Sequence, residues 1–137
     1  MSYLTKVFCG VTLILVPTIQ YGGYFLLQLL SGRYSSLELT EFQRAMFRAG
    51  HAHAGVLVIL SLIAQILIEH ASLASSLELF LRFGFPLSAI LISGGFFGGS
   101  IGPQITEPTK LIYLLYIGIG LLALCLVILG ISLIKNK

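Results

Sequence analysis

"LIYLLYIGIGLLALCLVILGISLI", residues 111–134, runs for 24 residues between Lys110 and Lys135 without a charged side chain. A helix needs about 20 predominantly apolar residues to cross the hydrocarbon core of a bilayer. The segment has that length, and it lacks the alternation of apolar and polar residues that marks a strand of a membrane β-barrel. We therefore predict a membrane-spanning helix over residues 111–134.

Three further charge-free windows of similar length precede this segment. They contain 26, 20 and 24 residues and lie between Lys6 and Arg33, between Arg48 and Glu69, and between Arg82 and Glu107. Helices are favoured in each, because backbone groups in lipid must be satisfied within the segment. With their flanks they predict helices over residues 5–30, 40–70 and 79–100. The expected fold is all-α, an integral membrane four-helix bundle with a long second helix, and residues 1–137 form a single transmembrane domain.

Composition and charge agree with this prediction. The chain is 57% hydrophobic and 9% charged, whereas ordinary soluble domains are about 25% charged. The net charge is +3, but the cations stand at segment ends, where they anchor at headgroups, and no basic run indicates a nucleic acid partner. Arg82 is expected to be such an anchor. The first window is too long for a cleaved signal peptide and is expected to remain as a helix.

Several residues carry local predictions. Pro17 is expected to kink the first helix, and Cys9 and Cys125 are expected to be buried apolar fillers without a disulfide. Two capping boxes precede the second helix, Ser35 with Glu38 and Thr40 with Gln43. The overlapping glycine pairs Gly94/Gly98 and Gly95/Gly99 indicate close helix packing, or alternatively a thin place against which a ligand rests.

The second helix carries most of the polarity. At 100° per residue, one third of its circumference collects Arg44, Arg48, His51, Gln65 and Glu69, with Gly55 opening a gap among them. Polar groups at membrane depth normally face the bundle interior or a water-filled cavity, so this stripe is expected to face inward.

The two histidines of this helix diverge. His53 lies opposite His51, so the two cannot bind one small ion together in regular geometry. His51 is expected to meet Gln20, Tyr21 or Tyr24 of the first helix. His53 is expected to face the third or fourth helix, or another protomer. Three copies of His53 in a trimer would suit zinc or copper, and two copies in a dimer could supply both axial ligands of a haem.

"GHAHAGVLVILSLI", residues 50–63, resembles the start of a helix in a loose set of small bacterial four-helix membrane proteins with a His-x-His motif. More distantly it is similar to the histidine-bearing helices of the haem–copper oxidase subunit I superfamily and of NnrS-type haem and copper membrane proteins. The resemblance implies that His51 or His53 ligates haem iron or copper. It also implies a bacterial inner membrane location.

The leading hypothesis is thus a homo-oligomeric membrane protein that binds haem or a transition metal (copper or zinc) through His51, His53 or both. Gly50 and Gly55 would give clearance, Arg48 or Arg44 would pair with a haem propionate, and Gln20 and Tyr24 would lie nearby. Its role would be redox chemistry, sensing or metal handling. Catalysis by side chains alone is not predicted, since the chain has no Asp and no hydrolase motif, and no catalytic residue is assigned.

Two alternatives stay open. One is a small proton-linked transporter or channel that uses Arg48, His51, Gln65 and Glu69 as a polar path. The other is a structural or accessory subunit. Four crossings place both termini on one side of the membrane, and the cytoplasmic side is favoured if Arg44 and Arg48 belong to a helix rather than to a loop.

Overall fold

The computed structural model describes residues 1–33 and 38–135, and four long helices dominate it. The helices are α1 (Tyr3–Leu30), α2 (Glu41–Glu69), α3 (Ser75–Gly98) and α4 (Tyr113–Lys135), with a 3-10 turn, η1 (Lys110–Ile112), directly before α4. Each of the four spans is long and apolar enough to cross a membrane. The prediction of an all-α chain with four such helices is confirmed.

The start of α3 differs from the prediction. The helix begins at Ser75 and not at residue 79, so most of the expected connector "SLASSLE" is helical. Glu78 lies in this first turn, where a carboxylate interacts favourably with the helix dipole. It also reaches Arg82 four residues later, and such pairs support a helix.

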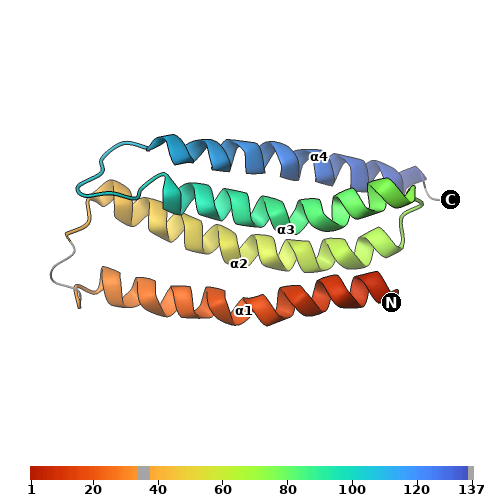
Figure 1. The fold of residues 1–137 in the computed structure, drawn as a ribbon, viewed down its shortest axis with the longest axis horizontal. Coiled ribbons are helices and arrows are strands. Elements are labelled where there is room, and N and C mark those ends of the chain that lie inside the picture. Colours follow the sequence, from red (N-terminus) through yellow and green to blue (C-terminus); the bar gives the residue numbers. More distant parts are fainter. Residues whose placement is uncertain (34–37, 136–137) are drawn as a thin grey trace.

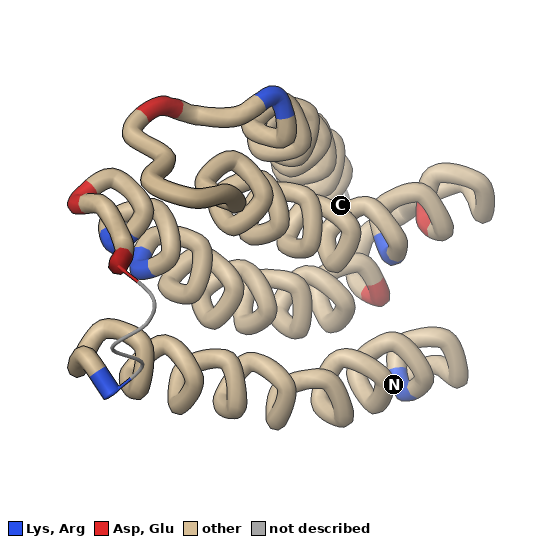
Figure 2. The backbone as a smooth tube through the Cα atoms, turned by 60° about the vertical axis from the view of Figure 1, so that its left-hand side comes forward, with Lys and Arg blue, Asp and Glu red and all other residues tan. Residues whose placement is uncertain are grey.

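The four helices run antiparallel in sequence order, as Figure 1 shows. The start of α1 and the end of α4 lie together at one end of the molecule, which we call the terminal end. Charged residues lie toward the two ends of the structure and leave the middle free of charge (Figure 2). This distribution matches what a helical protein needs when its middle is surrounded by hydrocarbon.

Three helices share the apolar core. One cluster, toward the terminal end, consists of Ala64, Ile68, Leu81, Phe85, Cys125 and Leu129. The other consists of Leu57, Ala89, Ile92 and Leu115. Both draw on α2, α3 and α4. In the most apolar stretch of each helix, 50% of the residues of α3 are buried but only 11% of those of α1. The central helix is therefore α3, and α1 lies beside the core.

Small residues allow α3 and α4 to approach closely. A Cβ atom added to Gly84 would lie 2.5 Å from Cys125 Sγ, and one added to Gly95 would meet the backbone of Leu115. From the other side, a Cβ on Gly118 would lie 2.8 Å from an Ile92 side-chain atom. The helix-packing interpretation of the glycines is thus confirmed at Gly95, and Cys125 is the buried filler that was expected.

A glutamine at the start of α2 holds the 99–109 loop. The Thr40 and Gln43 capping box is present, and the Ser35 box lies outside the described residues. Gln43 is 2% exposed, and its Nε2 donates to the carbonyls of Ser100 at 3.0 Å and Gly102 at 2.8 Å. One buried side chain therefore caps α2 and fixes the loop between α3 and η1.

Two neighbouring glycines test the α3–α4 contact. We expect Gly95→Ala to destabilise the protein by about 1–3 kcal/mol, because the new methyl group overlaps the Leu115 backbone. Gly94→Ala is the matched control, since a Cβ there meets no atom within 4 Å. It should be neutral or stabilise by up to about 1 kcal/mol through helix propensity. The free energy of unfolding, measured by titrating detergent micelles with SDS, separates the two, and equal effects would contradict the packing interpretation.

Candidate functional site

The two histidines of α2 face different neighbours. His51 is half-buried and faces α1, where a Cβ added to Gly23 would lie 2.8 Å from its Nε2. His53 is exposed and lies beside α3, with its ring centroid 4.7 Å from that of Phe96. The predicted divergence of the two side chains is confirmed, as are their neighbours, the first helix for His51 and the third for His53.

The hydrogen bond of His53 determines the form of its ring. Nδ1 lies 2.7 Å from the carbonyl oxygen of Ala49, one turn earlier in α2. A carbonyl can only accept, so Nδ1 carries a proton, and in the neutral ring Nε2 keeps its lone pair. His53 thus presents an electron-pair donor on the outer surface of α2, and Phe96 packs against one face of its ring.

Four other residues of the predicted site or its expected surroundings are exposed on α1 or α2. Gln20, Tyr21 and Tyr24 are exposed on α1, and the position of α1 that faces His51 Nε2 is Gly23. Arg48 is exposed, and it precedes His53 by five residues, which places it about 140° away around α2.

The two glycines expected to give clearance behave differently. A Cβ on Gly55 would meet no atom within 4 Å, whereas one on Gly50 would lie 3.0 Å from the Phe97 ring. Gly50 therefore serves the contact between α2 and α3, and its expected role in giving clearance is wrong. Gly55 does border open space.

The polar stripe of α2 does not face one common interior. Arg48 is exposed, and the half-buried Arg44 donates from Nε to the Leu39 carbonyl at 3.3 Å. Glu69 accepts a 2.6 Å hydrogen bond from the Ser2 backbone N–H and lies 3.2 Å from the amino group of Met1. The expectation of an inward stripe is wrong for Arg48, and Glu69 instead binds the start of α1 to the end of α2.

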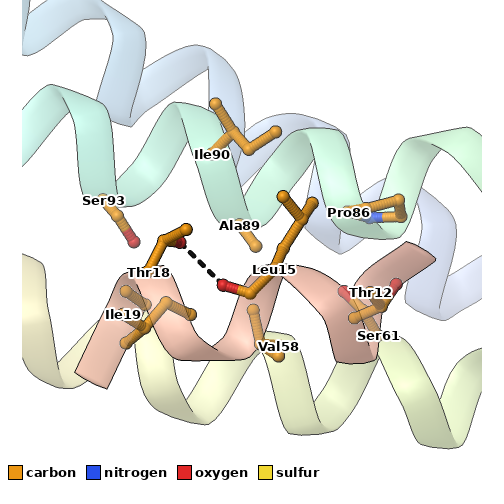
Figure 3. A pocket seen from close by; sticks show the side chains of 11 residues that line it. Thr12, Leu15, Thr18, Ile19, Val58, Ser61, Pro86, Ala89, Ile90 and Ser93 are labelled. Carbon is orange, nitrogen blue, oxygen red and sulfur yellow. Dashed lines mark hydrogen bonds between the residues drawn. The ribbon is translucent and has the colours of Figure 1, made fainter. Parts of the chain in front are cut away.

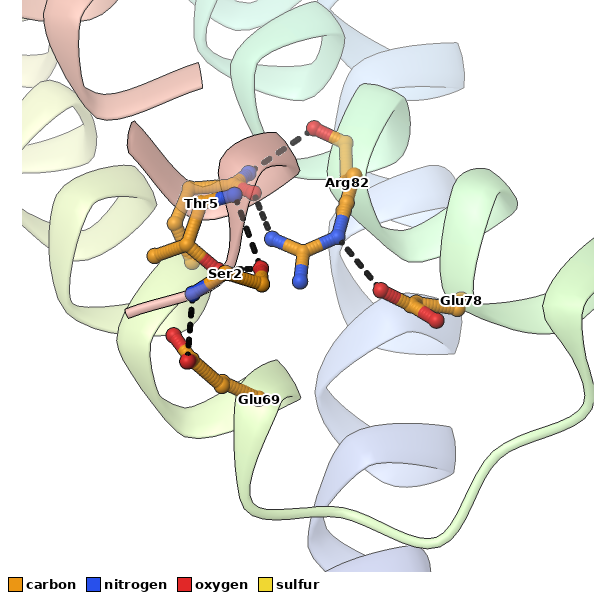
Figure 4. Close-up of polar contacts among 6 residues, drawn as sticks. Ser2, Thr5, Glu69, Glu78 and Arg82 are labelled. Atoms are coloured by element: carbon orange, nitrogen blue, oxygen red, sulfur yellow. Dashed lines mark hydrogen bonds and ion pairs between the residues drawn. The ribbon is translucent and has the colours of Figure 1, made fainter. Parts of the chain in front are cut away.

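Arg82 is not a headgroup anchor, because its side chain is 1% exposed. Its Nε donates to Glu78 Oε1 at 2.9 Å, and its Nη1 donates to Gln65 Oε1 at 3.0 Å (Figure 4). The backbone of Arg82 lies seven residues into α3, about 10 Å along the helix, and its guanidinium reaches back one turn to Glu78. The prediction of an anchor fails because α2 brings a buried acceptor, Gln65, to this depth.

A proline explains why Gln65 stands there. Pro86 has no backbone N–H, so the carbonyl of Arg82, four residues earlier, loses its helical partner. Gln65 Nε2 donates to this carbonyl at 2.9 Å, while its Oε1 accepts from the same arginine. One glutamine side chain therefore satisfies both a carbonyl released by proline and a buried charge. The sequence signal for the free carbonyl is Pro86 itself, because a proline inside a helix releases the carbonyl four residues earlier.

No metal cluster forms within one copy of the described chain. Among residues 1–33 and 38–135, His, Cys, Asp and Glu side chains nowhere gather in threes. A comparison with models of protein families, one with curated proteins and one with solved structures each found no match. Proposals about function therefore depend on the contacts of the chain itself.

A double-mutant cycle tests the Gln65 contact. We expect Gln65→Leu to cost about 3 kcal/mol, because it removes one of the two acceptors of the buried guanidinium and leaves the buried Arg82 carbonyl without a donor. In a Pro86→Ala background the restored N–H can donate to the Arg82 carbonyl, so the cost should fall by about 1 kcal/mol. The free energy of unfolding in SDS-containing micelles measures both.

The control for this cycle is Gln20→Leu, which removes an exposed amide from α1 and should change stability little. The proposed role of Gln65 would be wrong if its substitution were as mild as that of Gln20, or if Pro86→Ala left its cost unchanged.

Proposed function

We propose that the chain is an integral membrane protein whose copies associate through the outer face of α2, where His53 Nε2 ligates haem or a transition metal ion. The observation that carries the proposal is the 2.7 Å hydrogen bond from His53 Nδ1 to the Ala49 carbonyl. Histidine ligands commonly donate their second N–H to a carbonyl or carboxylate, which orients the ring and leaves the other nitrogen for the metal.

The surroundings of His53 support a bound partner. The side chain is exposed on a helix that is apolar enough to span a membrane. A polar group that faces hydrocarbon without a partner is destabilising, so an imidazole nitrogen at this place is best explained by a ligand or by a second copy. Phe96 holds the ring on the α3 side, and exposed Ala52 and Val56 flank it with short side chains.

A complete ligand set needs more than one copy, since His51 of the same helix faces α1. A dimer would supply two imidazoles, which suits the axial positions of a haem. A trimer would supply three, which suits zinc or copper. A bound haem or copper ion would supply electron transfer or sensing, and a bound zinc ion would indicate metal handling. The chain's own contribution is to fix the protonation and orientation of His53.

We further propose a bacterial inner membrane location with both termini in the cytoplasm. Arg44 and Arg48 belong to α2, so they count little in the comparison of loop charges. Three other cations flank the helices on the side of the termini, namely Lys6, Lys135 and Lys137, whereas two flank them on the other side, Arg33 and Lys110.

The alternative of a polar transport path has less support. It requires Gln65 and Glu69 to be available to a passing ion. Gln65 is 1% exposed and bonded to Arg82, and Glu69 is bonded to the start of α1. Pairs that hold helices together would have to open for transport.

Two histidine variants test the ligand assignment. In detergent-purified protein titrated with hemin, copper or zinc, we expect either a Soret band with one haem per dimer or one metal ion per trimer. His53→Ala should abolish this binding, because it removes the exposed nitrogen. His51→Ala is the matched control from the same helix and should retain it. Absorbance spectra, elemental analysis and light scattering measure the cofactor and the number of copies.

Three results would contradict the proposal. The first is wild-type protein that stays colourless and free of metal after titration. The second is binding that depends on His51 and not on His53. The third is a monomer that binds the cofactor with unchanged affinity.

A further inference from the structure

A cleft of about 340 Å³ lies between α1, α2 and α3, near the middle of the apolar span. Figure 3 shows side chains of all three helices around it. The cleft exists because α1 packs against its neighbours at two separate places. Toward the terminal end Thr5, Cys9 and Thr12 of α1 are buried, and toward the other end Leu26 and Leu29 are buried. Between them α1 contains Pro17 and leaves space.

The walls of this cleft are mostly apolar and uncharged. Seven of the eleven lining residues are aliphatic or proline, and the other four are the hydroxyl residues Thr12, Thr18, Ser61 and Ser93. A ligand that fits such walls is neutral, largely apolar and soluble in lipid, with a small number of polar atoms that set its orientation.

The four hydroxyl groups differ in their hydrogen bonds. Thr12 donates to the Phe8 carbonyl and Thr18 to the Leu15 carbonyl, each at 2.7 Å within α1. Ser61 and Ser93 are only 2% and 8% exposed, and within the part of the chain that the structure describes neither hydroxyl has a hydrogen-bond partner. Buried hydroxyls are normally satisfied, so each of these two lacks a partner that a ligand in the cleft could supply.

The two available hydroxyls stand at opposite ends of the cleft. Figure 3 shows Ser61 of α2 beside Thr12 and Pro86, whereas Ser93 of α3 lies near Thr18, with Ala89, Leu15 and Val58 between the two ends. The Ser93 hydroxyl points into the space between α3 and α1. A molecule that engaged both would need acceptors at its two opposite ends and an apolar body between them.

We propose that this cleft binds a neutral, lipid-soluble ring compound of the para-quinone class. Such a ring carries two carbonyl acceptors on opposite edges, and each would accept a hydrogen bond from one serine. The volume suits the ring, since it is roughly twice that of a cavity of about 150 Å³ that holds benzene. The ligand would enter the cleft from the bilayer beside α1, because this helix is packed less closely than the other three.

Duroquinone and hexamethylbenzene form a matched pair of probes, because methyl groups replace the two carbonyl oxygens at nearly constant shape. With the full chain in nanodiscs, and empty nanodiscs as reference, calorimetric titration should give one duroquinone per chain. The affinity for hexamethylbenzene should be lower by a factor of at least about ten, since this compound lacks both acceptors.

Three variants locate the site. Ser61→Ala and Ser93→Ala should each weaken duroquinone binding by about two- to tenfold and leave hexamethylbenzene unaffected. Ser132→Ala is the matched control, because its hydroxyl donates to the Ile128 carbonyl on α4 at 2.8 Å. Ala54→Leu places three more carbon atoms in the cleft and should abolish binding of both probes. The serine variants remove only one oxygen each and are expected to fold.

Every outcome decides the matter. Selective, saturable duroquinone binding that depends on both serines supports the site. Equal binding of the two probes, or duroquinone binding unaffected by the serine variants, would overturn the proposal. Either result would indicate that the cleft holds apolar molecules such as acyl chains without selectivity. Failure to bind duroquinone would overturn it as well. His53→Ala should leave duroquinone binding unchanged, so this test succeeds or fails independently of the proposed metal or haem site.

Discussion

The close contact of α3 with α4 is the constraint on which the arrangement of the helices depends. Gly84 and Gly95 of α3 and Gly118 of α4 have no room for a Cβ atom, so the two backbones meet with little between them. Phe85 and Ala89 of α3 belong to the clusters that contain α2 as well as α4 residues. With α3 covered by α2 and α4, α1 packs mainly against α2 and leaves a cleft along its middle.

An apolar environment requires a partner for each buried polar group, and several contacts of this chain follow from that rule. Pro86 releases a carbonyl, and Gln65 supplies the missing donor. The same glutamine accepts a hydrogen bond from Arg82, and Glu78 neutralises the charge of this arginine. Gln43 plays a comparable part for the loop carbonyls at the other end. These side chains stabilise the packing of helices and are poor candidates for transport or catalysis.

The groups that stand apart from this rule are the ones to which we assign function. Nε2 of His53 keeps its lone pair on an exposed helix face, and the hydroxyls of Ser61 and Ser93 are buried within a cleft without a protein partner in the described chain. Ala54 follows His53 directly and lines the cleft, while His53 itself turns toward Phe96. The two proposed sites therefore lie on different sides of α2, and we expect a substitution at one to leave the other unchanged.

Local sequence patterns were enough to predict the helical class, the four spans, the Thr40 and Gln43 cap of α2 and the divergence of His51 from His53. Each of these depends on local composition or on the 100° advance per residue, which requires no knowledge of neighbouring helices. Four features became visible only when the helices were packed together: Arg82 is buried, Gln65 is its partner, Gly95 and not Gly94 meets α4, and a cleft opens beside α1. Those features depend on the rotation and axial offset of one helix relative to another, and an apolar segment of uniform composition carries little local information about either.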